Sequence, residues 1–106
     1  MSDSAQDKPD YIVDQLAHVV DKLKDLLARM PPVKRRQAAE ALDVAMARLR
    51  SDPLGWGEAA FRTIKDGGLV CLGVARPFGV QYVAFEKEKV VCILDINILS
   101  GFAEET

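Results

Sequence analysis

A stripe of apolar side chains near the N-terminus constrains the fold of this 106-residue chain more than any other feature. Its members recur at alternating spacings of four and three residues, and a second row widens it: Ile12, Leu16, Val19, Leu23, Leu26 and Met30, with Val13, Val20 and Leu27 beside them. This is the period of one face of an α-helix. Asp7 or Asp10 is able to cap its start, and Pro31-Pro32 ends the run. The pattern predicts a helix over residues 10–29.

A second helix is predicted from about Pro32, because proline is tolerated in the first helical turn, to the Ser51-Asp52-Pro53 sequence. One face carries the apolar residues Ala38, Leu42, Ala45 and Leu49. The connection between the two helices is short, so they are expected to form an antiparallel hairpin, with the alanines allowing close approach.

The second half of the chain has the composition of a small sheet. Residues 69–75, 80–85 and 90–98 are rich in valine and isoleucine, and Pro77-Phe78-Gly79 and Lys87-Glu88 supply turns between them. They predict an antiparallel meander whose last strand is central or covered on both faces. The preceding LGWGEAAFRTIKDGG stretch is predicted to be a loop anchored by Trp56 and Phe61. The expected fold class is α+β, a helical hairpin packed on a small antiparallel β-meander.

Composition and charge narrow the function classes. With 49% apolar and 28% charged residues, the chain suits one domain, predicted over residues 9–106 after a polar tail at 1–8. A net charge of -2 provides no global positive field for nucleic acid. No secretory signal or membrane-spanning stretch is visible, so a cytoplasmic location is expected.

Metal and histidine chemistry have little support in the sequence. Cys71 and Cys92 lie in apolar runs without metal-ligand spacing and are predicted to be buried free thiols. His18 is the single histidine, and no nucleophile stands at a recognisable spacing from it. A partly exposed helix histidine is therefore the prediction for His18, and no metal or cofactor is expected.

The segment of residues 35–95 resembles the RelE/ParE family of bacterial toxin-antitoxin modules. The resemblance covers about 60 of 106 residues and is carried by RLRSDPLGWGE, which contains an L-x-x-D-P phrase, by GGLVCLGV, and by PFGVQYVAFEKEKVVCILDI with its tyrosine on the second meander strand. It implies a toxin that cleaves mRNA on the ribosome or blocks DNA gyrase, and an antitoxin partner that neutralises it. Family members commonly begin with an edge strand, which makes an extended segment over residues 11–15 the alternative to the helix.

The resemblance points to Arg76 and Tyr82 as candidate catalytic residues. RNA cleavage needs a cation to stabilise the phosphate together with an acid and a base. Arg76 is a candidate for the cation, Tyr82 for a stacking or proton-shuttling group, and three lysines for phosphate contacts: Lys65, Lys87 and Lys89. The alternatives are a Tyr82 that packs in the sheet and an Arg76 that is a surface turn residue.

A positive cluster at the helical bend is a second candidate for binding RNA or an acidic partner: Arg29, Lys34, Arg35 and Arg36. Its alternative is a solvated helix start. Ribonuclease members of the family also carry arginines along the meander strands, where this chain has Cys71 and Gly73. Enzyme activity therefore stays open at this point, and the alternative function is a non-catalytic binding or regulatory module that associates with another chain or with itself.

Overall fold

The computed structural model describes residues 10–62 and 67–99, without the side chains of residues 60–62. Along the chain the elements are β1 (Ile12–Gln15), α1 (Ala17–Ala28), α2 (Pro32–Ser51), α3 (Pro53–Trp56), β2 (Glu58–Arg62), β3 (Leu69–Ala75), β4 (Phe78–Phe85) and β5 (Val90–Ile98). The predicted tail at residues 1–8 lies outside the described residues, and the single domain over 9–106 stays a prediction.

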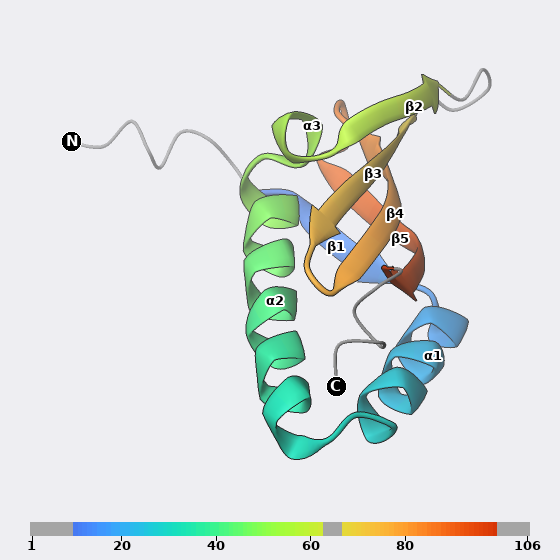
Figure 1. Ribbon diagram of the computed structural model, residues 1–106. Coiled ribbons are helices and arrows are strands. Elements are labelled where there is room, and N and C mark those ends of the chain that lie inside the picture. The colour runs from blue at the N-terminus through green and yellow to red at the C-terminus, as the bar shows by residue number, and fades with distance from the viewer. Residues whose placement is uncertain (1–9, 63–66, 100–106) are drawn as a thin grey trace.

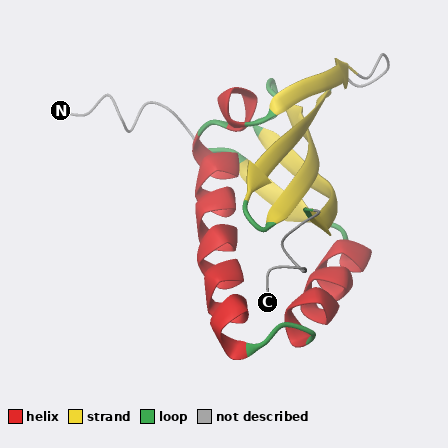
Figure 2. Cartoon of the chain, viewed as in Figure 1, coloured by secondary structure: helices red, strands yellow, loops and turns green. Residues whose placement is uncertain are grey.

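The strands form one five-stranded sheet in the order β1-β5-β4-β3-β2 (Figure 2). The meander β3-β4-β5 is antiparallel throughout, as predicted. The α+β class is confirmed as well. The sheet is larger than the sequence suggested, because β2 adds to β3 antiparallel at one edge and β1 adds to β5 parallel at the other. Strand β5 consequently has a neighbour on both sides over its first half.

The start of the predicted first helix is wrong, and the extended alternative is correct. Residues Ile12 to Gln15 pair with β5, and the helix begins only at Ala17, after Leu16 in an extended conformation. Tyr11 is buried whereas Ile12 is 64% exposed, so the local pattern alternates with the period of a strand. Pairing with β5 supplies the backbone hydrogen bonds that a helix would otherwise provide, and this tertiary contact overrides the helical spacing.

The second helix begins and ends where the sequence placed it, at Pro32 and Ser51. The two long helices are consecutive, but they diverge from their connection instead of lying side by side (Figure 1). Helix α2 packs against β1, β3 and β4, whereas α1 packs against β5. Helices α1 and α2 also contact each other, and Ala38 and Ala45 of α2 are buried where α2 approaches its neighbours.

The stretch predicted as a loop before the meander forms regular elements over residues 54–56 and 58–62. It contains α3 and the edge strand β2, and a bulge between Ala59 and Phe61 interrupts the pairing of β2 with β3. Trp56 is the predicted anchor and packs on the core, while the side chain of Phe61 lies outside the described part. The second meander strand begins at Phe78, two residues before its predicted start at residue 80, because Phe78 already pairs with Ala75 of β3 and Ile98 of β5.

The core lies between the helices and one face of the sheet. It includes Val19 of α1, Leu49 of α2 and a run of alternate β4 residues, namely Phe78, Val80, Tyr82 and Ala84. Both cysteines are free, with Cys71 buried and Cys92 half-buried. His18 is exposed on α1. In the part of the chain that is described, no helix combines the length and apolar character needed to cross a membrane.

Candidate functional site

Tyr82, one of the two candidate catalytic residues, is completely buried. It points from β4 into the core, and its hydroxyl donates a hydrogen bond to the Pro53 carbonyl and accepts one from the Gly57 N–H at 3.0 Å. The hydroxyl thus fastens both ends of α3 to the centre of the sheet. This placement matches the packing alternative and argues against a Tyr82 that touches RNA.

Electrostatics lead to the same assignment for Tyr82. The pKa of the Tyr82 phenol is raised far above its ordinary value of 10.0. Burial is the largest cause, and the neighbouring Cys71 thiol is the second. The pKa of Cys71 is raised too, chiefly because the thiol is buried. Both groups stay protonated at neutral pH, so neither is suited to take up a proton in a reaction.

An aromatic stack completes this junction. The rings of Trp56 and Tyr82 lie nearly parallel, with centroids 5.8 Å apart and an interplanar angle of 16°. Gly73 on β3 leaves the space that the indole fills, because a Cβ at this position would lie 2.4 Å from the Trp56 ring. Cys71 is itself buried, so Cys71 and Gly73 both belong to the packing of the core.

Arg76 and the lysines of the β4-β5 turn do not converge. Arg76 is exposed in the β3-β4 turn, whereas Lys87 and Lys89 follow the other end of β4. The eight residues of β4 at about 3.3 Å each place the two turns about 23 Å apart. Lys89 also makes a cation–π contact within the fold, because its ammonium lies 4.9 Å from the centroid of the Tyr11 ring. No single phosphate contacts both groups of cations.

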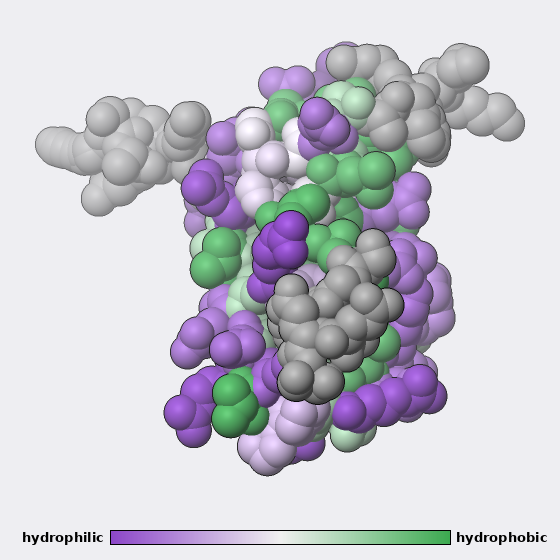
Figure 3. All heavy atoms as spheres, viewed as in Figure 1, coloured by the Kyte–Doolittle hydropathy of each residue, from purple (hydrophilic) through white to green (hydrophobic). Residues whose placement is uncertain are grey.

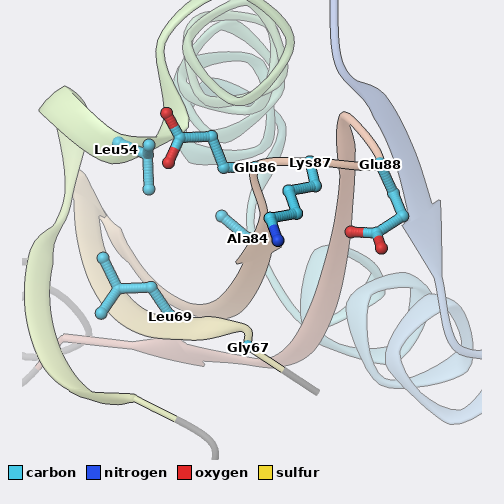
Figure 4. A pocket seen from close by; sticks show the side chains of 7 residues that line it. All are labelled: Leu54, Gly67, Leu69, Ala84, Glu86, Lys87 and Glu88. Atoms are coloured by element: carbon cyan, nitrogen blue, oxygen red, sulfur yellow. The ribbon is translucent and has the colours of Figure 1, made fainter.

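Lys87 lines a cavity of about 380 Å³ between α3 and the ends of the meander strands. In Figure 4 its side chain extends over Ala84, with the carboxylates of Glu86 and Glu88 on either side of it. Leu54, Leu69 and Ala84 supply apolar surface, and Gly67 completes the lining. With two carboxylates against one ammonium, the cavity repels a phosphate rather than attracting it.

Two of the four cations in the positive cluster at the helical bend, Arg35 and Arg29, make contacts within the fold. Arg35 donates to the carbonyls of Leu27 at 3.2 Å and Met30 at 3.0 Å, so it satisfies the free end of α1. Arg29 forms a 3.0 Å ion pair with Asp25 one turn earlier on α1. Lys34 is half-buried and Arg36 is exposed. Lys65 lies outside the described residues.

The face of the sheet turned away from the core carries a row of residues set by the strand register. Glu58, Leu72, Gln81 and Asp95 are successive partners across β2, β3, β4 and β5. Leu72 is 53% exposed and Val74, two residues further on β3, is 56% exposed. Figure 3 shows hydrophobic surface gathered over β3. The sequences of β3, β4 and β5 contain no lysine or arginine, so these three strands supply no cation for RNA cleavage.

A polar cluster at the far end of that row was missed by the sequence analysis. Lys22 of α1 donates to Asp95 at 3.0 Å and to Asn97 at 2.7 Å, and Asp95 also accepts from the Ile96 N–H at 2.8 Å. The Lys22 ammonium accordingly lowers the pKa of Asp95 below its ordinary value of 3.8. Nothing in the sequence pairs Lys22 with residues more than 70 positions away, and only the docking of α1 on β5 brings them together.

The described residues therefore offer surfaces for binding and no convergent catalytic set. Tyr82 is buried, and the cations proposed for RNA lie at separate places or are paired within the fold. Among the described residues no group of three or more histidines, cysteines or carboxylates is placed to hold a metal ion.

Two solved structures resemble this chain over most of its length. One is the RelBE2 toxin-antitoxin complex of Mycobacterium tuberculosis, at a TM-score of 0.58 and 18% identity, covering 85% of this chain and 92% of that one. The other is the archaeal RelE-RelB complex of Pyrococcus horikoshii, at a TM-score of 0.55 and 20% identity, covering 86% and 97%. No family model and no curated protein matches the sequence. The shared helix and strand arrangement establishes that this chain has the RelE fold.

Proposed function

We propose that this chain is the RelE-like toxin of a bacterial toxin-antitoxin module and that an antitoxin protein binds and silences it. The observation that carries the proposal is the RelE fold, shared over 85% or more of the chain with two proteins that were each crystallised in a RelE-RelB type complex. The free thiols of Cys71 and Cys92 suit the reducing cytoplasm, where we place its action.

The antitoxin is proposed to lie across the face of the sheet that is turned away from the core, which we call the open face. Leu72 and Val74 are more than half exposed there, and such apolar surface in a soluble fold marks a binding site. The charges beside them, Glu58 and the Asp95–Lys22 pair, form a polar rim. An extended or helical antitoxin segment fits this surface.

Of the two targets that the RelE/ParE resemblance implies, we favour inhibition of DNA gyrase by binding over cleavage of mRNA. Cleavage requires a cation, an acid and a base around one phosphate, and Arg76 stands apart from Lys87 and Lys89. Inhibition by binding needs only a complementary surface.

Growth during controlled expression in bacteria tests the proposal. We expect growth to arrest when the chain is expressed alone and to resume when an antitoxin encoded beside it is expressed with it. Plasmid supercoiling and transcript integrity, measured in the arrested cells, separate the two targets. Loss of supercoiling with intact transcripts supports gyrase inhibition, whereas cut transcripts that become intact in an Arg76→Ala variant support RNA cleavage.

The second candidate function is a non-catalytic regulatory module with the same fold. The observation in its favour is the use of Tyr82 and Arg35 as structural residues, which removes both from the set available for catalysis. Normal growth of cells that accumulate the folded chain would favour this candidate over the toxin.

A further inference from the structure

The outer face of α2 carries a row of exposed residues that no other part of the described chain covers. Its members follow one another at spacings of four, three, four and three residues: Val33, Gln37, Glu40, Val44 and Ala47. This spacing is that of a helix face which packs on another helix. The buried residues Ala38, Ala45 and Leu49 form a separate row toward the sheet, so α2 has one face in the core and a second that is free.

The two valines of this row are the most conspicuous feature of the outer face. Val33 is 70% exposed and Val44 is 55% exposed, on the same side of the helix and about 16 Å apart along its axis. Figure 3 shows small hydrophobic patches among hydrophilic residues along the side of the molecule that α2 forms. A shallow pocket of about 240 Å³ opens next to Val33, lined by Pro32, Arg36, Gln37 and Glu40.

Charged residues of both signs lie between the valines. Arg36, Glu40 and Asp43 are exposed, and the described residues form no ion pair or side-chain hydrogen bond with them. Arg36 and Glu40 are four residues apart but do not pair within the helix. The arginine precedes the acid, which is the weaker order for such a pair.

We propose that this face binds the same face of a second copy of the chain, with the two α2 helices antiparallel. A two-fold axis between the positions of Ala38 and Ala39 places Val33 of each copy opposite Val44 of the other. Gln37 then lies opposite Glu40. Arg36 is one residue away from the position that faces Glu40 of the second copy and two residues away from the position that faces its Asp43. These offsets correspond to about 1.5–3 Å along the helix axis. The surface is complementary to itself in both shape and charge, as a symmetric dimer requires.

The size of this contact sets the strength of the dimer. A single helix of 20 residues is about 30 Å long and provides less area than a standard stable interface of about 800 Å² per partner. The dimer is therefore weak and forms with rising concentration. The proposal is independent of the toxin assignment, because it uses only residues of α2.

Sedimentation equilibrium of the full chain tests the dimer. The average mass is expected to rise from that of the 11.7 kDa monomer toward twice this value as the concentration increases into the range of about 100 µM. A Val44→Glu variant is expected to stay monomeric, while Ala39→Glu, on the same helix but off the row, is expected to behave like the parent chain. A mass that stays monomeric throughout would overturn the proposal, whether or not another protein covers this face.

Charge exchange tests the antiparallel register. Arg36→Glu alone places like charges opposite each other in a homodimer, and so does the Glu40→Arg/Asp43→Arg double variant. A mixture of the two restores attraction at both symmetric positions, because each variant supplies what the other lacks. We expect each variant alone to lose association at least tenfold and the mixture to recover it, with circular dichroism showing all chains folded. Dimers that persist in both variants, or a mixture that fails to associate, would contradict the register.

Discussion

The centre of the sheet and the outer face of α2 use their polar groups in opposite ways. Around Tyr82 the hydroxyl is bonded to Pro53 and Gly57, and the ring is stacked on Trp56. On α2, Arg36 and Glu40 are exposed and make no ion pair with described residues. A residue type associated with catalysis thus serves the fold, whereas a stretch of ordinary helix residues is available to a partner. Whether a side chain is already bonded within the fold, more than its chemical type, decides if it serves the fold or can bind a partner.

The largest expected effect is at Tyr82. Tyr82→Phe leaves the Gly57 N–H and the Pro53 carbonyl without their buried partner and should lower the free energy of unfolding by about 1–3 kcal/mol. Urea unfolding followed by circular dichroism measures this change. Tyr11→Phe is the matched control, since no described group bonds to the Tyr11 hydroxyl, and it should have a smaller effect. An unchanged stability in Tyr82→Phe, together with lost activity, would restore the catalytic assignment.

Gly73→Ala tests the packing of the same region. The added methyl group meets the Trp56 ring at 2.4 Å, so we expect a loss of about 1–3 kcal/mol by overpacking. The double variant Gly73→Ala/Trp56→Phe has a smaller ring at the contact and should lose less than the sum of the single variants. Strict additivity in thermal or urea unfolding would show that the two residues are not in contact.

At the helical bend, Arg35→Ala should cost about 1 kcal/mol. The guanidinium bonds to two carbonyl groups at the end of α1, and its removal leaves them to water. Arg36→Ala, its neighbour with no such bonds, should leave the stability of the dilute chain within about 0.5 kcal/mol of the parent. Equal effects of the two substitutions would contradict the distinction drawn within this cluster.

The smallest effect is expected at the Lys22–Asp95 pair, whose side chains are both 38% exposed. Because the pKa of Asp95 is lowered in the folded chain, its contribution is present above the ordinary value of 3.8 and is lost as pH falls through the folded value. Asp95→Asn should therefore lower the stability by about 0.5 kcal/mol at pH 7. This difference should shrink toward pH 2. A difference that is independent of pH would show that the carboxylate charge plays no part.

Elements that local interactions determine were predicted correctly, whereas an element that depends on a contact distant in sequence was not. The bounds of α2 and the meander strands at residues 69–75 and 90–98 were predicted because proline positions and local periodicity determine them. Strand β1 was placed in a helix because Ile12 and Leu16 share a helical spacing, and its pairing with β5 is a contact between residues about 78 positions apart. No periodicity within one segment contains that information.

The same reasoning applies to the candidate site. The sequence identified Tyr82 as unusual, and the packing alternative was already available from its position in a strand. Its burial depends on α3, which the sequence analysis interpreted as loop. The structural use of Arg35 and Arg29 was hidden because a cluster of like charges looks the same whether it is solvated, paired or bonded to carbonyl groups.

The most direct test of the account is calorimetric titration of the full chain with the protein encoded by the neighbouring reading frame. The account predicts a stoichiometric complex with a dissociation constant below about 1 µM, weakened at least tenfold by Leu72→Glu on the open face of the sheet. Ser51→Glu, an exposed position at the end of α2, should leave it unchanged. The absence of any complex between the two folded proteins would contradict the claim that this RelE fold works as the toxin of a toxin-antitoxin pair.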